Sequence, residues 1–556
     1  MHSLAFGGPP NAARGPRALP GASSQSHYRK IRWRGARRLH KVAGTFPMTT
    51  TRLLLITSTL LAVPAWADVR LPAIISDHMV LQQETPANIW GWADAGEKVS
   101  VKFADKSGEA TADEKGRWGV KLTGLEAGKT GELTIAGKNT LTIKDVVVGE
   151  VWVGSGQSNM EWVVSNSMNP KEEAAAADFP MIRMFTVKKK QALEPQDDCE
   201  GSWQVCTPQT VPGFSAVAYY FGRKLHQALK QPIGLIHTSW GGTPAEYWTP
   251  KAVLAADPEL KPLVEAWEKK VADYPAAKVA HDAAMEKFRE EEKTLKEAGK
   301  PVPKPPSAPK GGSADGSPGS LFNGMIAPIV PYSIRGAIWY QGESNASRAK
   351  QYQKMFPTMI VSWRALWGSE FPFLFVQLAN FMQRVEQPQE SQWAELREAQ
   401  LQTLELPRTG MAVAIDIGDA KDIHPKNKQE VGRRLALAAE ATVYYIDQEY
   451  SGPICMGSQE EDGKMRLSFR NADGMKATDG GKLKGFAIAG EDRKFVWAET
   501  EVQGDHVIVS SPQVAKPVAV RYAWADNPEC NLVNATGLPA SPFRTDNWSA
   551  GAPAAK

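Results

Sequence analysis

The fold of this chain is decided by the stretch VVVGEVWVGSGQSNM, residues 146–160. Its first half is a mostly apolar run, which is typical of a buried strand. The run ends in a glycine-rich loop that presents Ser158, and Ser158 with Glu161 also matches the capping-box pattern of a helix start. Open α/β sheets place their sites at the carboxyl ends of parallel strands. We therefore expect a serine hydroxyl beside free backbone N–H groups, which is half of an acyl-transfer site.

Strand and helix patterns alternate from residue 146 onward, which predicts βαβ units around a parallel sheet in an α/β fold. Apolar runs typical of buried strands lie at 146–153, 233–239, 334–340, 371–377 and 411–417. Helical patterns between some of these runs lie at 216–230, 347–367 and 428–445. The carboxyl ends of the predicted strands should therefore meet at one edge of the sheet.

All-β regions flank this part of the chain. Short alternating runs broken by turn residues predict a β-sandwich over 68–145, and similar runs return over 446–556. The α/β part then spans 146–445. It is interrupted at 251–320 by an Ala-, Lys- and Glu-rich segment, which we expect to form a helical hairpin, and by a Pro-rich loop.

The start of the chain has the features of a dispensable leader, residues 1–67. Residues 1–47 are rich in Arg, Gly and Pro, whereas 48–67 combine a basic start, an apolar run and a small-x-small end. The second pattern is typical of a signal peptide, cleaved before Asp68. Because a signal peptide stands at the true N-terminus, we expect translation to start at Met48 and the protein to be exported, either periplasmic or secreted.

Net charge argues against one class of partner. The chain has 65 Lys and Arg against 61 Asp and Glu, but ten of the basic residues and none of the acidic ones fall in the leader. The rest of the chain therefore carries a net charge of −6, which gives no electrostatic support to nucleic-acid binding. No run after the leader is long and apolar enough to span a membrane. We expect neither a nucleic acid nor a membrane as partner, and the oligomeric state stays open.

The four cysteines are compatible with two states. In an exported protein they can form disulfides, with Cys199–Cys206 and Cys455–Cys530 as the pairing that the spacing suggests, or remain free thiols. The sequence contains neither a Cys-x-x-Cys nor a His-Glu-x-x-His pattern. A zinc site therefore has no support, and we expect no metal and no cofactor.

A nucleophilic serine requires a base, and histidines are scarce after the leader. His424 follows the predicted strand 411–417 in the segment DAKDIHP, so we expect it at the same sheet edge as Ser158. Asp422 stands two residues earlier, and in extended backbone the two side chains point the same way. We therefore expect His424 as the base and Asp422 as the acid that orients it. The other histidines are less suited to this role. His78 and His506 lie in the β regions and His281 in the inserted segment, while we expect His226 to be solvated on its helix and His237 to pack in the core.

Acyl transfer also needs donors for the oxyanion. Gly241 and Gly242 follow the predicted strand 233–239, and we expect one of their N–H groups to act together with that of Ser158. The stretch WYQGESN, residues 339–345, ends the next predicted strand and supplies side-chain amides and a carboxylate. Each of these segments taken alone could be a tight strand-to-helix turn. Three glycine-containing turns after strands, together with Asp-x-His, are better explained by an active site.

Taken together, these segments resemble the SGNH hydrolases, in particular the sialate O-acetylesterase and acetylxylan esterase group. The resemblance covers roughly 68–545, flanking β regions included, and rests on four blocks in order: GQSNM at 156–160, GG at 241–242, QGESN at 341–345 and DIHP at 422–425. It implies a flavodoxin-like three-layer sandwich with a parallel sheet. It also implies an esterase that forms an acetyl-enzyme and needs no cofactor.

Two blocks depart from the general SGNH pattern. The third is Gly-Glu-Ser-Asn where the general form is Gly-x-Asn-Asp, so Gln341 and Asn345 are both candidates for the oxyanion amide. The last block places Asp422 one residue closer to the histidine than the general form does. Because some related esterases use a glutamate of the third block as triad acid, Glu343 competes with Asp422 for that role.

The resemblance implies an O-acetylated carbohydrate as substrate, with sialic acid first and acetylated xylan or another polysaccharide second. An acidic protein needs local arginines to hold an anionic sialate; Arg348 and Arg397 are the candidates, and Gln157 beside the nucleophile is a further substrate contact. A rival of another class is a non-catalytic glycan-binding protein, since 18 tryptophans and two β regions are compatible with stacking on sugars. The joint presence of Ser158, His424 and acidic partners favours the enzyme.

Overall fold

The computed structural model describes residues 68–548. The expected leader with its signal peptide, residues 1–67, lies outside the described residues, as do the last eight residues of the chain. Within the described range, no helix combines the length and the apolar character that crossing a membrane requires.

The longest strand, β7 (Thr140–Gly156), takes part in two groups of strands. Its first half pairs antiparallel with β6 (Thr130–Ala136) and parallel with β1 (Val80–Gln82). Its second half pairs parallel with β10 (Ile233–His237) and β11 (Gly336–Tyr340). The strand therefore crosses the boundary expected between the N-terminal β region and the α/β part without a break.

The strands before β7 follow the alternating pattern of the sequence. β2 (Ala87–Trp92) pairs with β5 (Arg117–Leu122), and β3 (Lys98–Phe103) lies between β4 (Lys106–Thr111) and β6. Buried residues alternate with more exposed ones along β2, β3 and β5. Their buried side chains continue into the hydrophobic core of the parallel sheet, so the two regions share one core.

The central sheet has the strand order β13-β12-β11-β7-β10-β8-β9, and every pair in it is parallel except β8 with β9. The chain first adds strands on one side of β7 and then crosses to the other side with β11. The carboxyl end of β7 is therefore a topological switch point, the place where open α/β sheets bind ligands. The predicted α/β fold with a largely parallel sheet is confirmed. The remaining strands of this sheet are β8 (Phe179–Thr186), β9 (Trp203–Cys206), β12 (Phe373–Gln377) and β13 (Thr409–Val413).

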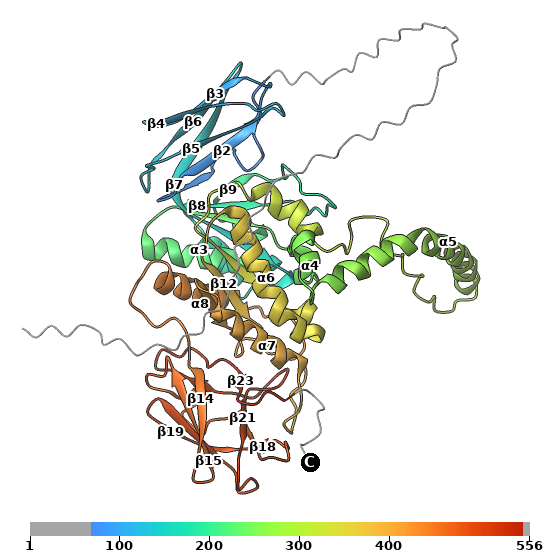
Figure 1. Cartoon of the computed structure of the whole chain (residues 1–556), viewed down its shortest axis with the longest axis vertical. Coiled ribbons are helices and arrows are strands. Elements are labelled where there is room, and N and C mark those ends of the chain that lie inside the picture. Colours follow the sequence, from blue (N-terminus) through green and yellow to red (C-terminus); the bar gives the residue numbers. More distant parts are fainter. Residues whose placement is uncertain (1–67, 549–556) are drawn as a thin grey trace, which may run out of the picture. The chain divides into compact units, whose positions relative to one another are not determined.

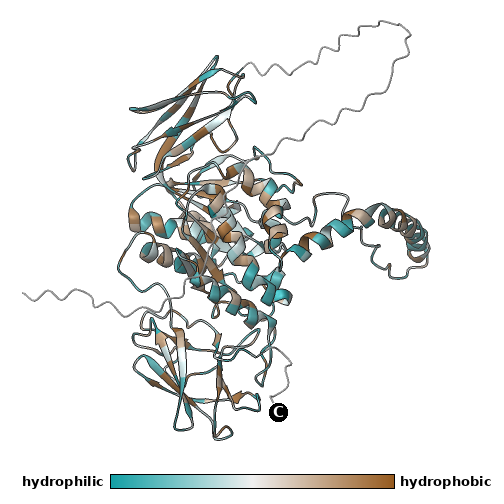
Figure 2. Cartoon of the chain, in the orientation of Figure 1, coloured by the Kyte–Doolittle hydropathy of each residue, from teal (hydrophilic) through white to brown (hydrophobic). Residues whose placement is uncertain are grey.

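Four helices pack against the central sheet (Figure 1). α3 (Ala216–Leu229) packs on α8 (Lys428–Thr442), and α6 (Ala349–Trp367) packs on α7 (Gln392–Gln402). Figure 2 shows the apolar residues of the sheet concentrated between these helices. Three of the helices lie where the sequence predicts them; α7, β8 and β9 are additional elements that the sequence patterns did not indicate.

Aromatic side chains pack between the central sheet and the helices on both faces of the sheet. Trp152 contacts Phe221 of α3 with 5.0 Å between ring centroids, and Trp339 contacts Trp363 of α6 with 5.9 Å. The register pairs Trp339 with Ser155, three positions after Trp152, so the two tryptophans point to opposite faces. The two helix pairs therefore cover opposite faces of the sheet.

The insertion differs from the expected helical hairpin. After the short α4 (Lys251–Ala256), a single helix of 37 residues, α5 (Lys261–Glu297), takes up the whole Ala-, Lys- and Glu-rich segment. The helix continues through Pro275, because strong helix formers and ion pairs four residues apart, such as Lys261–Glu265, support it on both sides. Gly312 of the Pro-rich segment lies against Tyr274, so this segment returns along the helix.

The C-terminal β region has its own hydrophobic core, and its strands agree with the predicted runs. Two four-stranded sheets enclose this core, in the orders β14-β15-β20-β19 and β18-β17-β21-β23. Their strands are β14 (Ile454–Glu461), β15 (Lys464–Arg470), β17 (Phe486–Ala489), β18 (Val496–Trp497), β19 (Glu499–Gln503), β20 (His506–Ser510), β21 (Ala519–Tyr522) and β23 (Phe543–Arg544).

Candidate active site

Ser158 and His424 meet at the carboxyl edge of the central sheet. Ser158 is the first residue of α1 (Ser158–Glu161), directly after β7, and His424 lies on the loop between β13 and α8. The Oγ atom of Ser158 is 2.9 Å from Nε2 of His424. This distance is within the range of a hydrogen bond between a nucleophile and its base. The loop after β13 thus brings the histidine back to the central strand.

Asp422 and Trp162 hold the histidine from two sides. Oδ1 of Asp422 is 3.3 Å from Nδ1 of His424 and accepts a hydrogen bond of 2.9 Å from the backbone N–H of the same histidine. The indole of Trp162 stacks on the imidazole, with 5.0 Å between centroids and 15° between the planes. The ring orientation is therefore set by a carboxylate at its Nδ1 edge and by an aromatic face.

Glu343 is close to the nucleophile's neighbour rather than to the histidine. Its Oε1 atom accepts a hydrogen bond of 2.6 Å from Nδ2 of Asn159, while Oε2 is buried and has no partner among the described residues. Burial raises the pKa of this carboxyl above its usual value. The same Asn159 amide donates to the carbonyl of Ile423 at 3.1 Å. Glu343 therefore acts on the loop of the histidine through Asn159.

Lys428 is a buried residue of this site that the sequence patterns did not single out. Its Nζ atom donates to Oδ1 of Asn159 and lies 5.9 Å from the ring centroid of Trp162 and 5.3 Å from that of Tyr340. Burial lowers its pKa to about 7, against the opposing effect of Glu343 and Asp422. A signal was present, since a lysine in the first turn of a helix is unfavourable to the helix dipole.

The two glycines after β10 differ in what their amides do. The N–H of Gly241 donates to Oε2 of Glu161 at 2.6 Å, and Glu161 is also paired with Lys189. In the part of the chain that the structure describes, no group accepts a hydrogen bond from the amides of Ser158 and Gly242. Gly242 has φ of 72°, a conformation that favours glycine. Of the two glycines, Gly242 therefore offers the open donor.

The capping-box pattern that Ser158 and Glu161 match in the sequence does not form in the structure. The cap of α1 is Gln157, which makes no side-chain capping bond, and Ser158 is already inside the helix. The carboxylate of Glu161 turns to the Gly241 amide instead, since a glycine turn passes directly against Ser158.

The side-chain amides of Gln341 and Asn345, in the third block, form hydrogen bonds within the protein. Nε2 of Gln341, a fully buried residue, donates to Oδ1 of Asn345 at 2.7 Å, and that oxygen also accepts from the backbone N–H of Ala245 at 2.9 Å. Nδ2 of Asn345 donates to Glu246 at 3.0 Å. These bonds hold the loop after β10 in place. Nε2 of Gln341 has a second acceptor, the carbonyl of Thr243 at 3.4 Å, so both of its N–H groups are engaged and it has no free donor for an oxyanion. For Asn345, one N–H of the amide is engaged by Glu246.

The three residues expected to contact the substrate are engaged within the protein. Oε1 of the buried Gln157 accepts from the backbone N–H of Ser344 at 3.2 Å. Arg348 is bound to Glu246 at 2.5 Å. Arg397 is fully buried, and its guanidinium donates to the backbone carbonyls of Leu378, Ala379, Ala525 and Asp526. Arg397 thus joins the sheet to the C-terminal β region, which corrects its expected role in substrate binding.

Replacing Arg397 should test this structural role. We expect Arg397→Met to lower the free energy of unfolding by about 3–5 kcal/mol, because four buried carbonyls lose their donor. Urea unfolding measures the change, and Arg433→Met, at a partly exposed local pair with Glu430, should change it by less than about 0.5 kcal/mol. A loss below about 1 kcal/mol in Arg397→Met would contradict the assignment.

His237 is a core histidine, as expected. It ends β10, is buried, and its Nε2 is 2.5 Å from Oγ of Ser239. Burial lowers its pKa to about 4 from an ordinary value of 6.5. It is therefore neutral in the folded protein under conditions that protonate it in the unfolded chain.

This difference predicts a pH effect on stability. Between pH 6.5 and about 4 the unfolded chain binds a proton at His237 that the folded protein does not, so stability falls as the pH is lowered, by about 3 kcal/mol. Urea unfolding gives the difference in free energy of unfolding between the wild type and His237→Gln. Between pH 7 and pH 4 this difference should change by the same amount in favour of the variant. Parallel pH curves of the two proteins would exclude the effect.

All four cysteines are free thiols in the structure, which decides between the two expected states. Within residues 68–548, no group of three or more His, Cys, Asp and Glu residues is arranged to hold a metal ion.

Comparisons with known proteins point to one family. A family described as "Carbohydrate esterase, sialic acid-specific acetylesterase" matches residues 315–441. The sialate O-acetylesterase of Mus musculus is 30% identical over 537 residues, covering 85% of this chain and 94% of that protein, and the Homo sapiens enzyme is 29% identical over 540 residues. A carbohydrate acetylesterase structure from Xanthomonas citri matches with a TM-score of 0.74 and 37% identity, covering 86% of this chain and all of that one.

Proposed function

Because the chain belongs to the sialate O-acetylesterase family and is a carboxylic ester hydrolase, we propose that it removes O-acetyl groups from carbohydrates with Ser158 as nucleophile. The observation that carries this proposal is the distance of 2.9 Å between Oγ of Ser158 and Nε2 of His424. A serine activated by an adjacent imidazole is the arrangement that acyl transfer requires.

The first half of the reaction forms an acetyl-enzyme. Nε2 of His424 takes the proton of the Ser158 hydroxyl while Oγ attacks the acetyl carbonyl carbon. The negative charge that develops on the carbonyl oxygen is stabilised by the amides of Ser158 and Gly242, which have no acceptor among the residues described. The C–O bond to the sugar then breaks, and the imidazolium returns its proton to the leaving sugar oxygen.

The second half releases acetate. His424 takes a proton from a water molecule, and the resulting hydroxide attacks the acetyl carbonyl of Ser158. Breaking the bond to Oγ returns the proton to the serine and frees acetate. Asp422, 3.3 Å from Nδ1 of His424, stabilises the imidazolium in both halves. The reaction needs one water molecule and, in this scheme, no metal or cofactor.

The sugar we propose first is O-acetylated sialic acid, with acetylated xylan or another polysaccharide as the second candidate. The likeness to the sialate O-acetylesterases supports the first. The arginines expected to hold a sialate carboxylate are otherwise engaged, Arg348 with Glu246 and Arg397 with backbone carbonyls, and this observation keeps the second candidate in place. The choice between them is therefore an experimental one.

Acetate release from both substrates, measured side by side with the chain starting at Asp68, decides between these sugars. Release from O-acetylated sialic acid alone supports the first candidate, and release from acetylated xylo-oligosaccharide alone supports the second. No release from either, with the protein folded, would contradict the carbohydrate assignment. Labelling by a fluorophosphonate probe then separates an esterase for another acyl ester from a non-catalytic glycan-binding protein, which should not be labelled.

The last part of the proposal is that the protein is exported from the cytoplasm. The signal-peptide pattern at 48–67 supports a periplasmic or secreted enzyme that begins at Asp68. N-terminal sequencing of protein expressed from Met48 and recovered outside the cytoplasm should begin at Asp68. Full-length protein retained in the cytoplasm would contradict this part of the proposal.

A further inference from the structure

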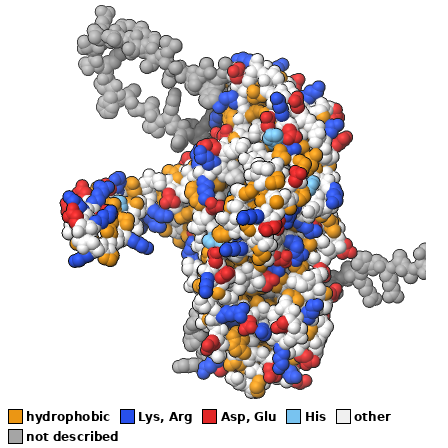
Figure 3. Space-filling model, turned by 180° about the vertical axis from the view of Figure 1, so that it is seen from behind, with side chains coloured by type: hydrophobic (Ala, Val, Ile, Leu, Met, Phe, Trp, Pro, Cys, Tyr) orange, Lys and Arg blue, Asp and Glu red, His pale blue; other side chains and the backbone are white. Residues whose placement is uncertain are grey.

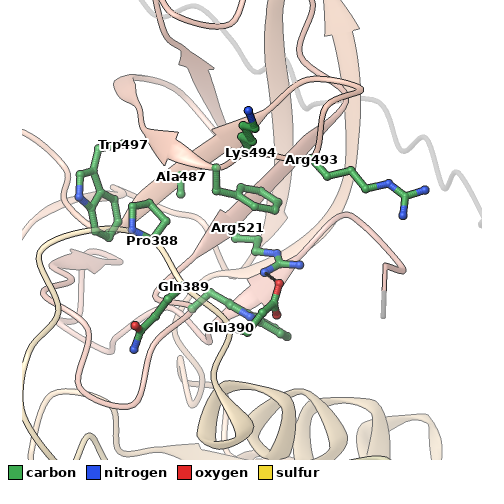
Figure 4. Close-up of a pocket in the computed structure, with 11 residues that line it drawn as sticks. Pro388, Gln389, Glu390, Ala487, Arg493, Lys494, Trp497 and Arg521 are labelled. Carbon is green, nitrogen blue, oxygen red and sulfur yellow. Dashed lines mark hydrogen bonds and ion pairs between the residues drawn. The ribbon is translucent and has the colours of Figure 1, made fainter. Parts of the chain in front are cut away.

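The C-terminal β region contains a cavity that the chemistry at Ser158 does not use. It lies where the β18-β17-β21-β23 sheet meets residues 388–390 and has a volume of about 340 Å³. This is within the size range of small-ligand sites. Figure 4 shows Trp497, Pro388 and Lys494 around it, with Arg521 and Glu390 paired at its side. None of its lining residues belongs to the site at Ser158.

Trp497 forms an exposed aromatic wall of this cavity. The side chain is 43% exposed, and its Nε1 donates to the carbonyl of Glu386 at 2.8 Å, which fixes the ring. Trp497 and Gly485 also line a neighbouring cavity of about 510 Å³. A fixed indole face between two hollows suits a chain of sugar rings, because the apolar C–H face of a pyranose packs on an aromatic ring.

Trp524 also lines the cavity, where its side chain is 7% exposed. Its Nε1 atom is buried and out of reach of a ligand, so Trp524 contributes only ring surface to the cavity wall.

The charge of the cavity favours an anion. Among its basic residues, Arg521 is neutralised by Glu390 and Asp546, at 2.9 and 2.8 Å. Lys494 is exposed and has no ion-pair partner within residues 68–548. On the face shown in Figure 3, acidic and basic side chains are interspersed without a broad basic patch. The ammonium group of Lys494 is therefore a positive charge in the cavity lining that a bound anion would neutralise.

We propose that this cavity is a non-catalytic binding site for a carboxylate-bearing carbohydrate. The pyranose ring packs on Trp497, and the carboxylate is bound by Lys494. The ligand class, a glycan, rests on the proposed function, whereas the site itself does not depend on Ser158. Sialic acid and uronic acids share the required chemistry, and the test below distinguishes them.

Calorimetry with the chain from Asp68 onward tests the site, using sialyllactose, a xylo-oligosaccharide that carries glucuronic acid, and neutral xylohexaose. We expect at least one acidic sugar to bind at least tenfold more tightly than xylohexaose. Trp497→Ala and Lys494→Met should each weaken that binding at least tenfold. The matched controls are Tyr445→Ala, at a residue 85% exposed, and Lys464→Met at an exposed position of β15; both should bind as the wild type does.

The same variants separate this site from the esterase. Hydrolysis of 4-nitrophenyl acetate should be unchanged in all four, and circular dichroism should show the same fold. Equal binding of xylohexaose, absence of binding, or wild-type affinity in Trp497→Ala would overturn the proposal. Loss of the esterase proposal would instead appear as an inactive wild type that still binds acidic sugars through Trp497.

Discussion

Ser158→Ala is expected to reduce acetyl-ester hydrolysis by at least about 10⁴-fold, the scale on which removal of a nucleophile acts in serine hydrolases. The hydroxyl lost is the atom that lies 2.9 Å from Nε2 of His424, and no other serine hydroxyl is bound to that nitrogen among the described residues. The loss should appear in kcat, because the substituted alanine leaves the residues around position 158 in place. Acetate release and single-turnover kinetics measure it.

The variant must also fold for this result to be informative. Ser158 is half-buried at the start of a short helix, so removing one hydroxyl should change the free energy of unfolding by less than about 1 kcal/mol. Ser165→Ala, at an exposed serine a few residues on, is the matched control and should retain full activity. Activity of Ser158→Ala within tenfold of the wild type would end the assignment of Ser158 as nucleophile.

The sequence was most informative where one residue type at one position decides the local structure. The apolar run from Val146 indicated a buried strand, and the glycines after it marked its end, so the sheet and the position of Ser158 were predictable. Scarcity made His424 recognisable, since few histidines follow predicted strands. These features can be recognised from the sequence alone, because they depend on the order of elements along the chain and on which strand ends meet at the edge of a parallel sheet.

Hydrogen-bond partners were not predictable in the same way. Gln341 and Asn345 stand beside a glycine turn, but which way their amides point depends on Glu246 and on the loop after β10, a hundred residues earlier. The Gly241 amide is likewise occupied by Glu161 from another element. The structural role of Arg397 was not visible in the sequence because its four carbonyl acceptors come from segments distant along the chain.

The identity of the triad acid gives the second large effect. Asp422→Asn should lower kcat by about 10²–10³-fold, because the amide removes the negative charge 3.3 Å from Nδ1 of His424 that selects the tautomer and stabilises the imidazolium. We expect less than the roughly 10⁴-fold loss that such a change can cause, because Asp422 is 43% exposed and water screens its charge. Asp419→Asn, on the same loop, is the matched control and should leave kcat within about threefold.

Glu343→Gln provides the opposing test. Glutamine keeps an oxygen for the Asn159 amide, so the bond that orders the histidine loop can persist, and kcat should fall by less than about tenfold. Removing the charge takes away one of the two carboxylates that raise the pKa of Lys428, so that pKa should fall below about 7. Above the pKa of Lys428 in the folded protein, only the unfolded chain keeps the Lys428 proton, so the free energy of unfolding rises with pH. In Glu343→Gln this rise should begin at a lower pH. A large loss of kcat in Glu343→Gln together with a small one in Asp422→Asn would transfer the triad role to Glu343. The carboxylate that stabilises the imidazolium is the one whose removal lowers kcat more.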